Sequence, residues 1–325
     1  MDVPSTTFPK PEIPYAVGRR FTVHSHIPPG PTPVTRGCCL NGIQGREESR
    51  AVDPVERCLR YPPLAGSWGS FTVDLEIHDL IRIGDGHNAQ LFVVDVLETR
   101  SGSKDIQIEK KKKKLVAKVY DPLYFDDHGG YIDPFACVDK HYTHEVHAYH
   151  VLAEFQGRLI PRFYGSFSLE IPPCQGGSAT RTVRLILIEH IQGLSMRQVD
   201  AMRYPQDTRQ QIMKTVIEFE SAVYEKDVVL TDLSPRNVMV LDNVSDGVVF
   251  LDFAGAIFGR KLDEPIPSGV NLFLGQYISP LLRWDRDITF QFGEWIDWEW
   301  SGWMKAAFGD TAASITDEMR GAYCP

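Results

Sequence analysis

Five short segments between residues 71 and 191 place the strongest constraint on the fold. The first begins at Phe71, alternates apolar and polar residues, and ends in a glycine turn, as strands often do: FTVDLEIHDLIRIG. The other four are apolar segments of strand length: AQLFVVDVLE, LVAKVYD, RFYGSFSLE and VRLILIEHI. Because consecutive strands usually pair, these segments predict a five-stranded antiparallel sheet.

Helices are expected beside and after this sheet. One, CVDKHYTHEVHAYHVLAEF, lies between the third and fourth strand segments. Another, DTRQQIMKTVIEFESAVYEKD, has apolar residues at positions i, i+4, i+7 and i+11, namely Ile212, Val216, Phe219 and Val223. Five of the six tryptophans lie in the last seventy residues, four of them in WIDWEWSGWM. We expect these rings to form a core between helices, with stacking against an aromatic or sugar substrate as the alternative.

This order of elements predicts an α+β protein with a bilobal architecture. Residues 1–65 are rich in Pro and Gly and predict an arm that is extended or partly disordered. Residues 66–192 are expected to form an N-lobe with the five-stranded antiparallel sheet and one helix. Residues 193–325 are expected to form a mostly helical C-lobe.

Composition and charge argue against several classes of function. The net charge of −9 does not favour binding to nucleic acid or to an anionic membrane. No apolar run is long enough for a membrane span, and the N-terminus does not resemble a secretory signal. The six cysteines are scattered without a CxxC pair, so we expect reduced thiols in a cytoplasmic protein. The basic run Glu109–Lys114 leaves a nuclear location as an alternative.

Two features of the predicted sheet could contact a phosphate group. Gly84 and Gly86 fall in a turn between strands, where glycine lets backbone N–H groups approach phosphate oxygens, although most such turns are plain hairpins. Lys118 lies inside an apolar strand, and a lysine is rarely buried without a partner. It either faces water or is held for a phosphate, with Glu145 on the following helix as its partner.

Two aspartates lie between short apolar runs in residues 228–255, VVLTDLSPRNVMVLDNVSDGVVFLDFAG. Asp232 precedes Asn237 by five residues, and a proline fixes the turn between them. Asp252 follows an apolar strand, and Phe253 can pack beneath it. Carboxylate and amide oxygens suit Mg²⁺, which also takes phosphate oxygens and waters as ligands. The acids therefore either hold metal and phosphate or make only turn hydrogen bonds.

These features occur together in an order that resembles the protein-kinase-like family: glycine turn, strand lysine, helix glutamate, Asp-x-x-x-x-Asn loop and Asp-Phe pair. The resemblance covers roughly residues 71–260 and is closest to fungal protein kinase-like and aminoglycoside phosphotransferase-like proteins. It implies the bilobal protein-kinase-like fold. The segment Ile186–Gly193 is similar to the hinge of that family, which implies that Glu189 and Ile191 contact the nucleotide.

The resemblance also implies a role for each candidate residue. ATP would be bound by the glycine turn and by the strand lysine with its helix partner, that is, by Gly84, Gly86, Lys118 and Glu145. Asp232 would orient the attacking hydroxyl or accept its proton, and Asn237 and Asp252 would hold Mg²⁺. The implied function is an ATP- and Mg²⁺-dependent phosphotransferase, which phosphorylates a hydroxyl group of a small molecule or of a protein.

The sequence departs from protein kinases at several positions. Leu230 and Thr231 replace the usual His-Arg pair, and Ala254 replaces the glycine of Asp-Phe-Gly. No Ala-Pro-Glu element follows Asp252. These departures point toward the compact branch similar to aminoglycoside and choline phosphotransferases. They leave two alternatives: an inactive pseudokinase that acts as a binding or scaffold module, and an unrelated α+β protein whose acids are only turn residues.

Overall fold

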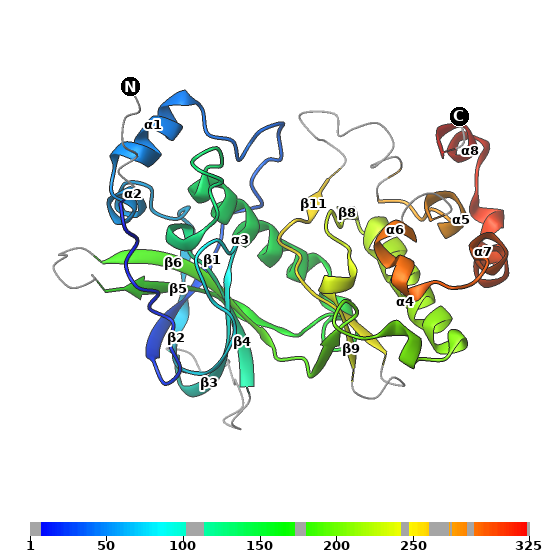
Figure 1. Ribbon diagram of the computed structural model, residues 1–325, viewed down its shortest axis with the longest axis horizontal. Coiled ribbons are helices and arrows are strands. Elements are labelled where there is room, and N and C mark those ends of the chain that lie inside the picture. Colours follow the sequence, from blue (N-terminus) through cyan, green and yellow to red (C-terminus); the bar gives the residue numbers. More distant parts are fainter. Residues whose placement is uncertain are drawn as a thin grey trace. The chain divides into compact units, whose positions relative to one another are not determined.

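The computed structural model describes residues 8–101, 114–172, 180–241, 247–259, 273, 275–284 and 289–323. Figure 1 shows the path of the chain and its elements. The chain divides into two compact units. Unit 1 consists of Met1–Thr32, Arg36–His147 and Arg162–His190, and unit 2 consists of Pro33–Thr35, Ala148–Pro161 and Ile191–Pro325.

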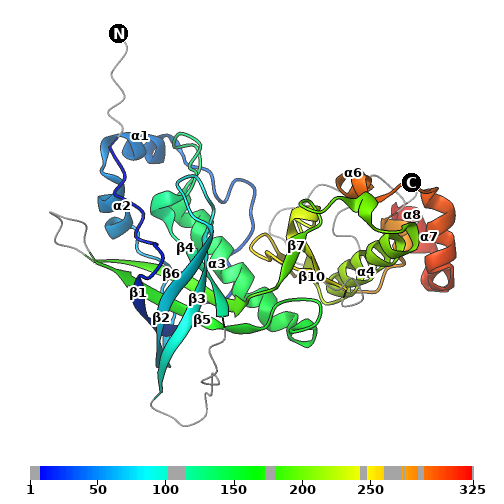
Figure 2. The same cartoon turned by 60° about the horizontal axis from the view of Figure 1, so that its bottom comes forward.

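Six antiparallel strands of unit 1 close into a barrel in the order β1-β2-β3-β4-β6-β5. These strands are labelled in Figure 2. The strands are β1 (Arg20–Ile27), β2 (Ser67–Arg82), β3 (Gln90–Ser101), β4 (Lys114–Tyr120), β5 (Phe163–Ile171) and β6 (Arg181–Glu189). The barrel closes because β1 pairs with β2 along one edge and with β5 along the other. Val23 of β1 lies opposite Val73 on β2 and opposite Leu169 on β5.

The core of unit 1 fills the inside of this barrel. Every second residue of a strand points to the same face of a sheet, so one set of alternating residues from each strand meets at the centre. On β4 these are Leu115, Ala117 and Val119, each fully buried. Tyr15, which precedes β1, also belongs to this core, and its ring stacks on Phe92 with centroids 5.5 Å apart.

The predicted bilobal protein-kinase-like fold, with an antiparallel-sheet N-lobe and a mostly helical C-lobe, is wrong. The sheet has not five strands, as predicted, but six, which close into a barrel. The difference comes from β1, which lies in the segment predicted to be an arm and joins the two edges of the sheet. Unit 2 is also not simply helical, because two small sheets lie among its helices.

Three helices and a 3-10 turn of unit 1 lie outside the barrel strands: α1 (Ile43–Ala51), α2 (Pro54–Arg60), η1 (Pro122–Tyr124) and α3 (Pro134–Val151), whose last turn belongs to unit 2. Aspartates begin two of these helices. Asp53 Oδ1 accepts from the N–H of Val55 at the start of α2, and Asp133 Oδ1 accepts from the N–H of Phe135 at the start of α3. A proline at the first helical position follows each aspartate, which is the preferred arrangement at a helix N-terminus.

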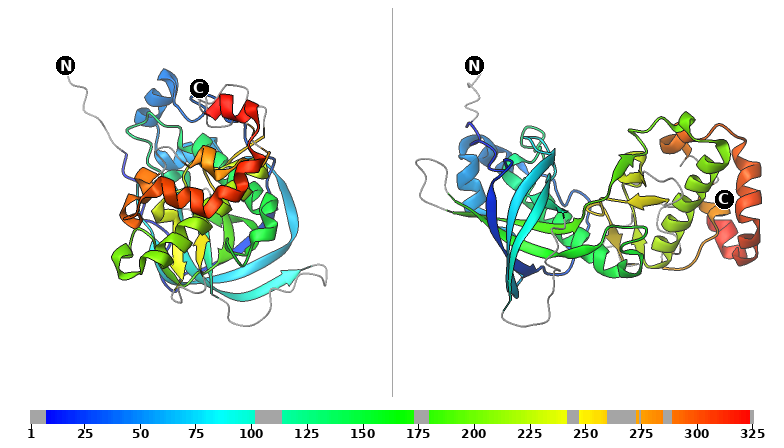
Figure 3. Two further views of the ribbon diagram at one scale, coloured as in Figure 1. Left: turned by 90° about the vertical axis from the view of Figure 1, so that its right-hand side faces the viewer. Right: turned by 90° about the horizontal axis from the view of Figure 1, so that it is seen from below.

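Unit 2 combines helices with two small sheets. Its helices are α4 (Gln206–Glu225), α5 (Pro280–Arg283), α6 (Thr289–Phe292), α7 (Trp300–Phe308) and α8 (Asp317–Tyr323). One sheet has the order β10-β9-β7, and β8 pairs with β11 in the other. These strands are β7 (Gly193–Ser195), β8 (Val228–Val229), β9 (Val238–Leu241), β10 (Val248–Phe250) and β11 (Ile257–Phe258). Figure 3 shows the C-terminal helices, in orange and red, beside α4.

The predicted amphipathic helix is confirmed as α4. Its four apolar positions are all buried, namely Ile212, Val216, Phe219 and Val223. Phe219 stacks on Phe250 of β10 with the ring centroids 3.9 Å apart, which fastens α4 to the small sheet. Trp295 is also buried, and its Nε1–H donates to the carbonyl of Met196 at 3.0 Å, so this ring belongs to the core of unit 2.

Two other sequence features can be placed only in part. Cys38, Cys39, Cys58 and Cys137 are free thiols, while Cys174 and Cys324 lie outside the described residues. Of the basic run Glu109–Lys114, only Lys114 is described, and it begins β4. Among the helices of the described segments, none combines the length and the apolar character that crossing a membrane requires.

Candidate functional site

A buried ion pair joins strand β4 to helix α3 in unit 1. Because Ala117 and Val119 point into the barrel, Lys118 between them points to the opposite face. There its Nζ contacts Oε2 of Glu145 at 2.5 Å. Lys118 is only 4% exposed and Glu145 only 1%. The lysine is therefore not a surface charge facing water, and the pairing suggested by the sequence is present.

Tyr120 completes this group of side chains. It lies two residues after Lys118 on β4 and so faces the same side of the strand. Its hydroxyl donates to Oε2 of Glu145 at 2.6 Å, and its ring centroid lies 5.8 Å from Lys118 Nζ. One carboxylate oxygen thus accepts from an ammonium and from a phenol. The two contacts fix the carboxylate and hold the lysine in one place.

The glycine turn lies between β2 and β3, and its N–H groups are already engaged. Gly84 N–H donates to Oε1 of Gln90 at 2.9 Å, and Nε2 of Gln90 donates back to the carbonyl of Gly84 at 2.8 Å. Gly86 N–H donates to the carbonyl of Tyr124 at 2.9 Å. The φ angle of Gly86 is 82°, a left-handed value that favours glycine. Glycine is thus required here for the turn itself, and phosphate binding by these N–H groups would need the turn to open.

Glu189 and Ile191 fall on either side of the unit boundary. Glu189 ends β6, and its N–H donates to the carbonyl of Arg162 at 2.9 Å. In return, Arg162 N–H donates to Oε2 of Glu189 at 3.1 Å. Ile191 is half-buried in the irregular segment before β7. Glu189 therefore cannot offer its N–H to a nucleotide without losing an existing hydrogen bond.

Asp232 and Asn237 face each other across a short loop of unit 2. The loop contains the 3-10 turn η4 (Pro235–Asn237). Nδ2 of Asn237 donates to the backbone carbonyl of Asp232 at 2.9 Å and to its Oδ2 at 3.1 Å. Since the amide nitrogen of Asn237 is directed at Asp232, its amide oxygen is left as an acceptor for another group. Asn237 is 8% exposed, so this orientation is held by its surroundings.

The hairpin of β9 and β10 brings Asp252 to the same end as Asn237. Val238 lies opposite Phe250, and the N–H of Leu251 donates to the carbonyl of Asn237 at 2.8 Å. Asn237 therefore immediately precedes β9, and Asp252 follows β10 by two residues. Its φ angle is 63°, a left-handed value that aspartate tolerates better than most residues. Asp232, Asn237 and Asp252 line one small hollow of unit 2.

The packing beneath this hollow explains one departure from the kinase pattern. Phe253 is buried, as expected, and its ring meets that of Tyr149 at a centroid distance of 5.4 Å. Ala254 is also buried, but its φ angle is not positive. The backbone at this position therefore does not require glycine, and alanine fits.

Sequence reasoning missed two residues that shape this loop. Nη2 of Arg236 contacts Oδ1 of Asp232 at 2.5 Å. This hydrogen bond raises the pKa of Arg236, and the charge of Asp252 contributes in the same direction. Thr231, noted only as a departure, donates through Oγ1 to the carbonyl of Gly255 at 2.7 Å. In the sequence, the only signal was that Thr231 and Arg236 lie close to Asp232. Such neighbours are too common near an aspartate to indicate a site.

The donors at the hollow fit one kind of metal site. Asn237 and Asp252 offer an amide oxygen and a carboxylate at one end of a hairpin. Across the residues that the structure describes, no three His, Cys, Asp or Glu side chains gather into a group that could hold a metal ion. Mg²⁺ bound together with a nucleotide needs only one or two carboxylates, because phosphate oxygens and waters complete its ligands. The donor set therefore fits a nucleotide-bound Mg²⁺.

Comparisons with known proteins assign the chain to no family. No family model matches the sequence, and no curated protein matches it either. A function must therefore rest on the chemistry of the residues described above.

Proposed function

We propose that the protein is an ATP- and Mg²⁺-dependent phosphotransferase that phosphorylates a hydroxyl group of a small molecule or of a protein. In this proposal the site residues work as their counterparts do in the protein-kinase-like family, although the barrel of unit 1 differs from the fold expected for that family. The support comes from the types and contacts of the residues.

The observation that carries the proposal is the buried pair of Lys118 and Glu145. A buried ion pair adds little stability over well-packed apolar residues, so stability alone is a weak reason for its presence. A lysine held in place by Glu145 and Tyr120 is a preorganised cation. Such a cation suits the α- and β-phosphates of ATP, because Glu145 and Tyr120 already fix its position.

Asp232 is suited to accept the proton of the attacking hydroxyl. Arg236 and Asn237 each contact one of its carboxylate oxygens, which fixes the plane of the carboxylate. The side chain is still 39% exposed, so an acceptor hydroxyl can reach it. Proton transfer to a positioned base contributes typically about 10²–10⁴-fold to a rate.

Asn237 and Asp252 would hold Mg²⁺ through an amide oxygen and a carboxylate. When bound, the ion would neutralise charge on the phosphates during transfer. Gly84 and Gly86 are not needed for this proposal, because their N–H groups already have acceptors in unit 1. Thr231 would support the metal site indirectly through its hydrogen bond to the segment that follows Asp252.

We also propose that the protein works in the cytoplasm. The four described cysteines are free thiols, as in a reducing compartment. ATP is abundant there as the phosphate donor. A tagged full-length chain seen only in the nucleus would contradict this location.

ATP hydrolysis tests the proposal without knowledge of the acceptor, because water can replace the hydroxyl compound. We expect slow Mg²⁺-dependent hydrolysis by the wild type. Asp232→Asn should lower this rate by about a hundredfold or more and change ATP affinity far less, since the proposed contacts to the phosphates and to Mg²⁺ come from other residues. Asp310→Asn is the control, because this aspartate is exposed and lies in the 3-10 turn η7 (Gly309–Ser314).

Two results would count against the proposal. Equal hydrolysis by wild type and Asp232→Asn would show that Asp232 is not the base. ATP binding by a wild type that neither hydrolyses ATP nor labels any hydroxyl compound would favour the inactive binding module. The contact of Arg236 with Asp232 is the observation that favours this alternative, because the cation competes with a substrate hydroxyl for the carboxylate.

A further inference from the structure

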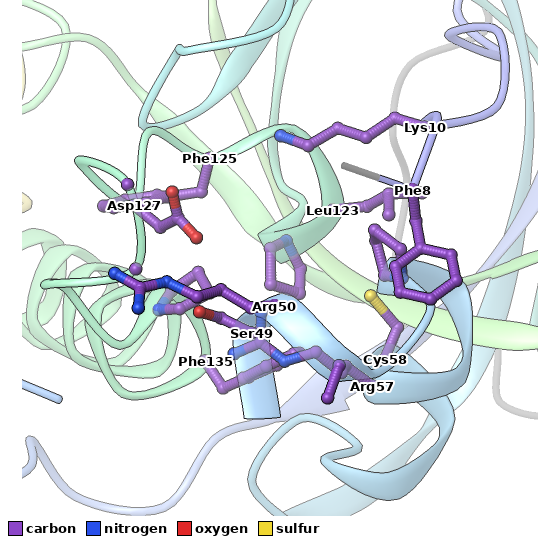
Figure 4. Close-up of a pocket in the computed structure, with 16 residues that line it drawn as sticks. Phe8, Lys10, Ser49, Arg50, Arg57, Cys58, Leu123, Phe125, Asp127 and Phe135 are labelled. Carbon is purple, nitrogen blue, oxygen red and sulfur yellow. The ribbon is translucent and has the colours of Figure 1, made fainter. Parts of the chain in front are cut away.

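A second cavity lies in unit 1, apart from Lys118 and Glu145. Its volume is about 810 Å³, and Figure 4 shows its walls. They come from the segment before β1, the end of α1, helix α2, η1 and the segment that leads into α3. Small-molecule sites usually measure about 300–1,000 Å³, so this cavity has the size of a ligand site.

Arg57 on α2 contributes a buried charge to this cavity. The residue is 7% exposed, and its Nε finds no hydrogen-bond partner among the described residues. Within the described part of the chain, no carboxylate or carbonyl contacts its guanidinium, which lies 5.2 Å from the ring centroid of Phe135. A buried charge without a counter-charge is costly, so its persistence calls for an explanation.

The other buried arginines of the described segments all donate hydrogen bonds through their guanidinium groups. Arg181 makes two hydrogen bonds to the carboxylate of Asp121. Arg209 donates to Asp297 and to a backbone carbonyl, and Arg184 donates to a serine hydroxyl and to another carbonyl. Arg57 differs from all three, because an acceptor for its guanidinium would have to come from outside the described chain.

The charges around the cavity favour an anion as that acceptor. Three of the sixteen lining residues are basic, Lys10, Arg50 and Arg57, and one is acidic, Asp127. Lys10 is paired with Asp85 at 2.6 Å, whereas Arg50 is exposed and contacts no carboxylate among the described residues. Burial raises the pKa of the Cys58 thiol to about 12, so this wall residue adds no negative charge. The interior is therefore positive near Arg57.

The remaining walls are apolar, and they indicate the body of the ligand. Phe125, Phe135 and Leu123 line the cavity together with three prolines, and Phe8 lies at one side. We propose that this cavity binds a small organic anion, whose negative group pairs with Arg57 and whose aromatic or aliphatic body packs against these phenylalanines. The proposal is independent of the phosphotransferase proposed above, because the cavity shares no residue with that site.

The test uses a fluorescent pair of probes on the full-length chain. 1-Anilinonaphthalene-8-sulfonate is an aromatic anion, and N-phenyl-1-naphthylamine is the same compound without the sulfonate. We expect the anionic probe to bind the wild type with one saturable site. Arg57→Gln should weaken that binding at least tenfold and leave the neutral probe almost unaffected. Arg60→Gln on the same helix is the control, because Arg60 is exposed and lies outside the cavity.

The outcomes separate the proposal from unspecific probe binding. Equal affinity of the anionic probe for wild type and Arg57→Gln would overturn it, as would a wild type that shows no saturable binding. If Arg57→Gln does not fold, Ala51→Trp decides the question, since Ala51 is an exposed wall residue where a large ring would fill the cavity. Loss of both probes in that variant would support the site, and retained binding of both would overturn it.

Discussion

Replacing Glu145 with glutamine would remove the carboxylate that the buried Lys118 contacts. Lys118 is 4% exposed, and its Nζ lies 2.5 Å from Oε2 of Glu145. Removing one partner of a buried ion pair costs about 3–5 kcal/mol. Because each 1.4 kcal/mol changes an equilibrium constant about tenfold, opening of this part of the barrel should become at least roughly a hundredfold more favourable.

The reciprocal change separates the charge from the hydrogen bonds. Lys118→Met should cost less than Glu145→Gln, because Tyr120 still donates to the carboxylate in that variant. In the double variant neither charge remains. We therefore expect its loss of stability to be smaller than the sum of the two single losses, by about 0.5–3 kcal/mol, which is the usual coupling between residues in contact.

Hydrogen exchange of the backbone amides of β4 and α3 measures this effect locally. It does not require that the two units unfold together. Glu154→Gln is the matched control, because Glu154 forms a 2.8 Å ion pair with Lys226 but is 59% exposed. Such a surface pair contributes at most about 1 kcal/mol. Each variant is compared by the increase in amide exchange near its own substituted residue. If Glu145→Gln increased exchange in β4 no more than Glu154→Gln does around residue 154, the stability of β4 would not depend on the ion pair of Lys118 and Glu145.

Three further predictions follow from single contacts. Thr231→Val removes the hydrogen bond to the Gly255 carbonyl and should weaken Mg²⁺-dependent ATP binding by roughly fivefold, about 1 kcal/mol, in a calorimetric titration, with serine at this position restoring it. The thiol of Cys39 accepts a hydrogen bond from Cys137, which lowers the pKa of Cys39 below that of an ordinary thiol, so its alkylation by iodoacetamide should rise at a lower pH than that of a free cysteine; an alkylation profile equal to that of free cysteine would refute this. Tyr15→Phe keeps the ring but removes the 2.7 Å hydrogen bond to a buried carboxylate, and should lower the melting temperature through a loss of about 1.5–3 kcal/mol; an unchanged melting temperature would show that the hydroxyl adds nothing.

Local patterns predicted part of the candidate site. Strand alternation determines that Lys118 points away from the barrel core. Its partner Glu145 lies on the helix that follows in the sequence, where it is also buried. The apolar spacing of α4 was equally direct, because its face is set by the helical period alone. The roles of these residues in catalysis were not determined by such patterns and stay a proposal.

The closing strand β1 could not be predicted in the same way. Its sequence, RFTVHSHI, alternates weakly and lies among prolines and glycines. It becomes a strand by pairing with β2 and with β5, whose partner residues lie roughly forty to a hundred and fifty positions later in the chain. Such long-range pairing depends on the whole barrel and leaves little trace in the local pattern. The predicted five-stranded sheet was wrong for this reason.

The surroundings of the glycine turn and of Arg57 depend on long-range packing that the sequence does not reveal. The N–H groups of Gly84 and Gly86 are engaged by Gln90 and by the carbonyl of Tyr124, and the latter residue lies 38 positions after Gly86. Arg57 resembles any other charged residue of a short helix in the sequence. Only the folded chain shows that it is buried beside a cavity and that its Nε has no acceptor in the part of the chain that the structure describes.

A thermal-shift titration with ATP tests the central claim most directly. It compares wild type with Asp252→Ala, each with and without Mg²⁺. Ligand at about a hundredfold over its dissociation constant should add roughly 2.7 kcal/mol to the stability of the wild type. We predict a shift that needs Mg²⁺ and that disappears in Asp252→Ala. The absence of any shift with ATP and Mg²⁺, or a shift of equal size in the variant, would contradict the assignment of a nucleotide and metal site to these residues.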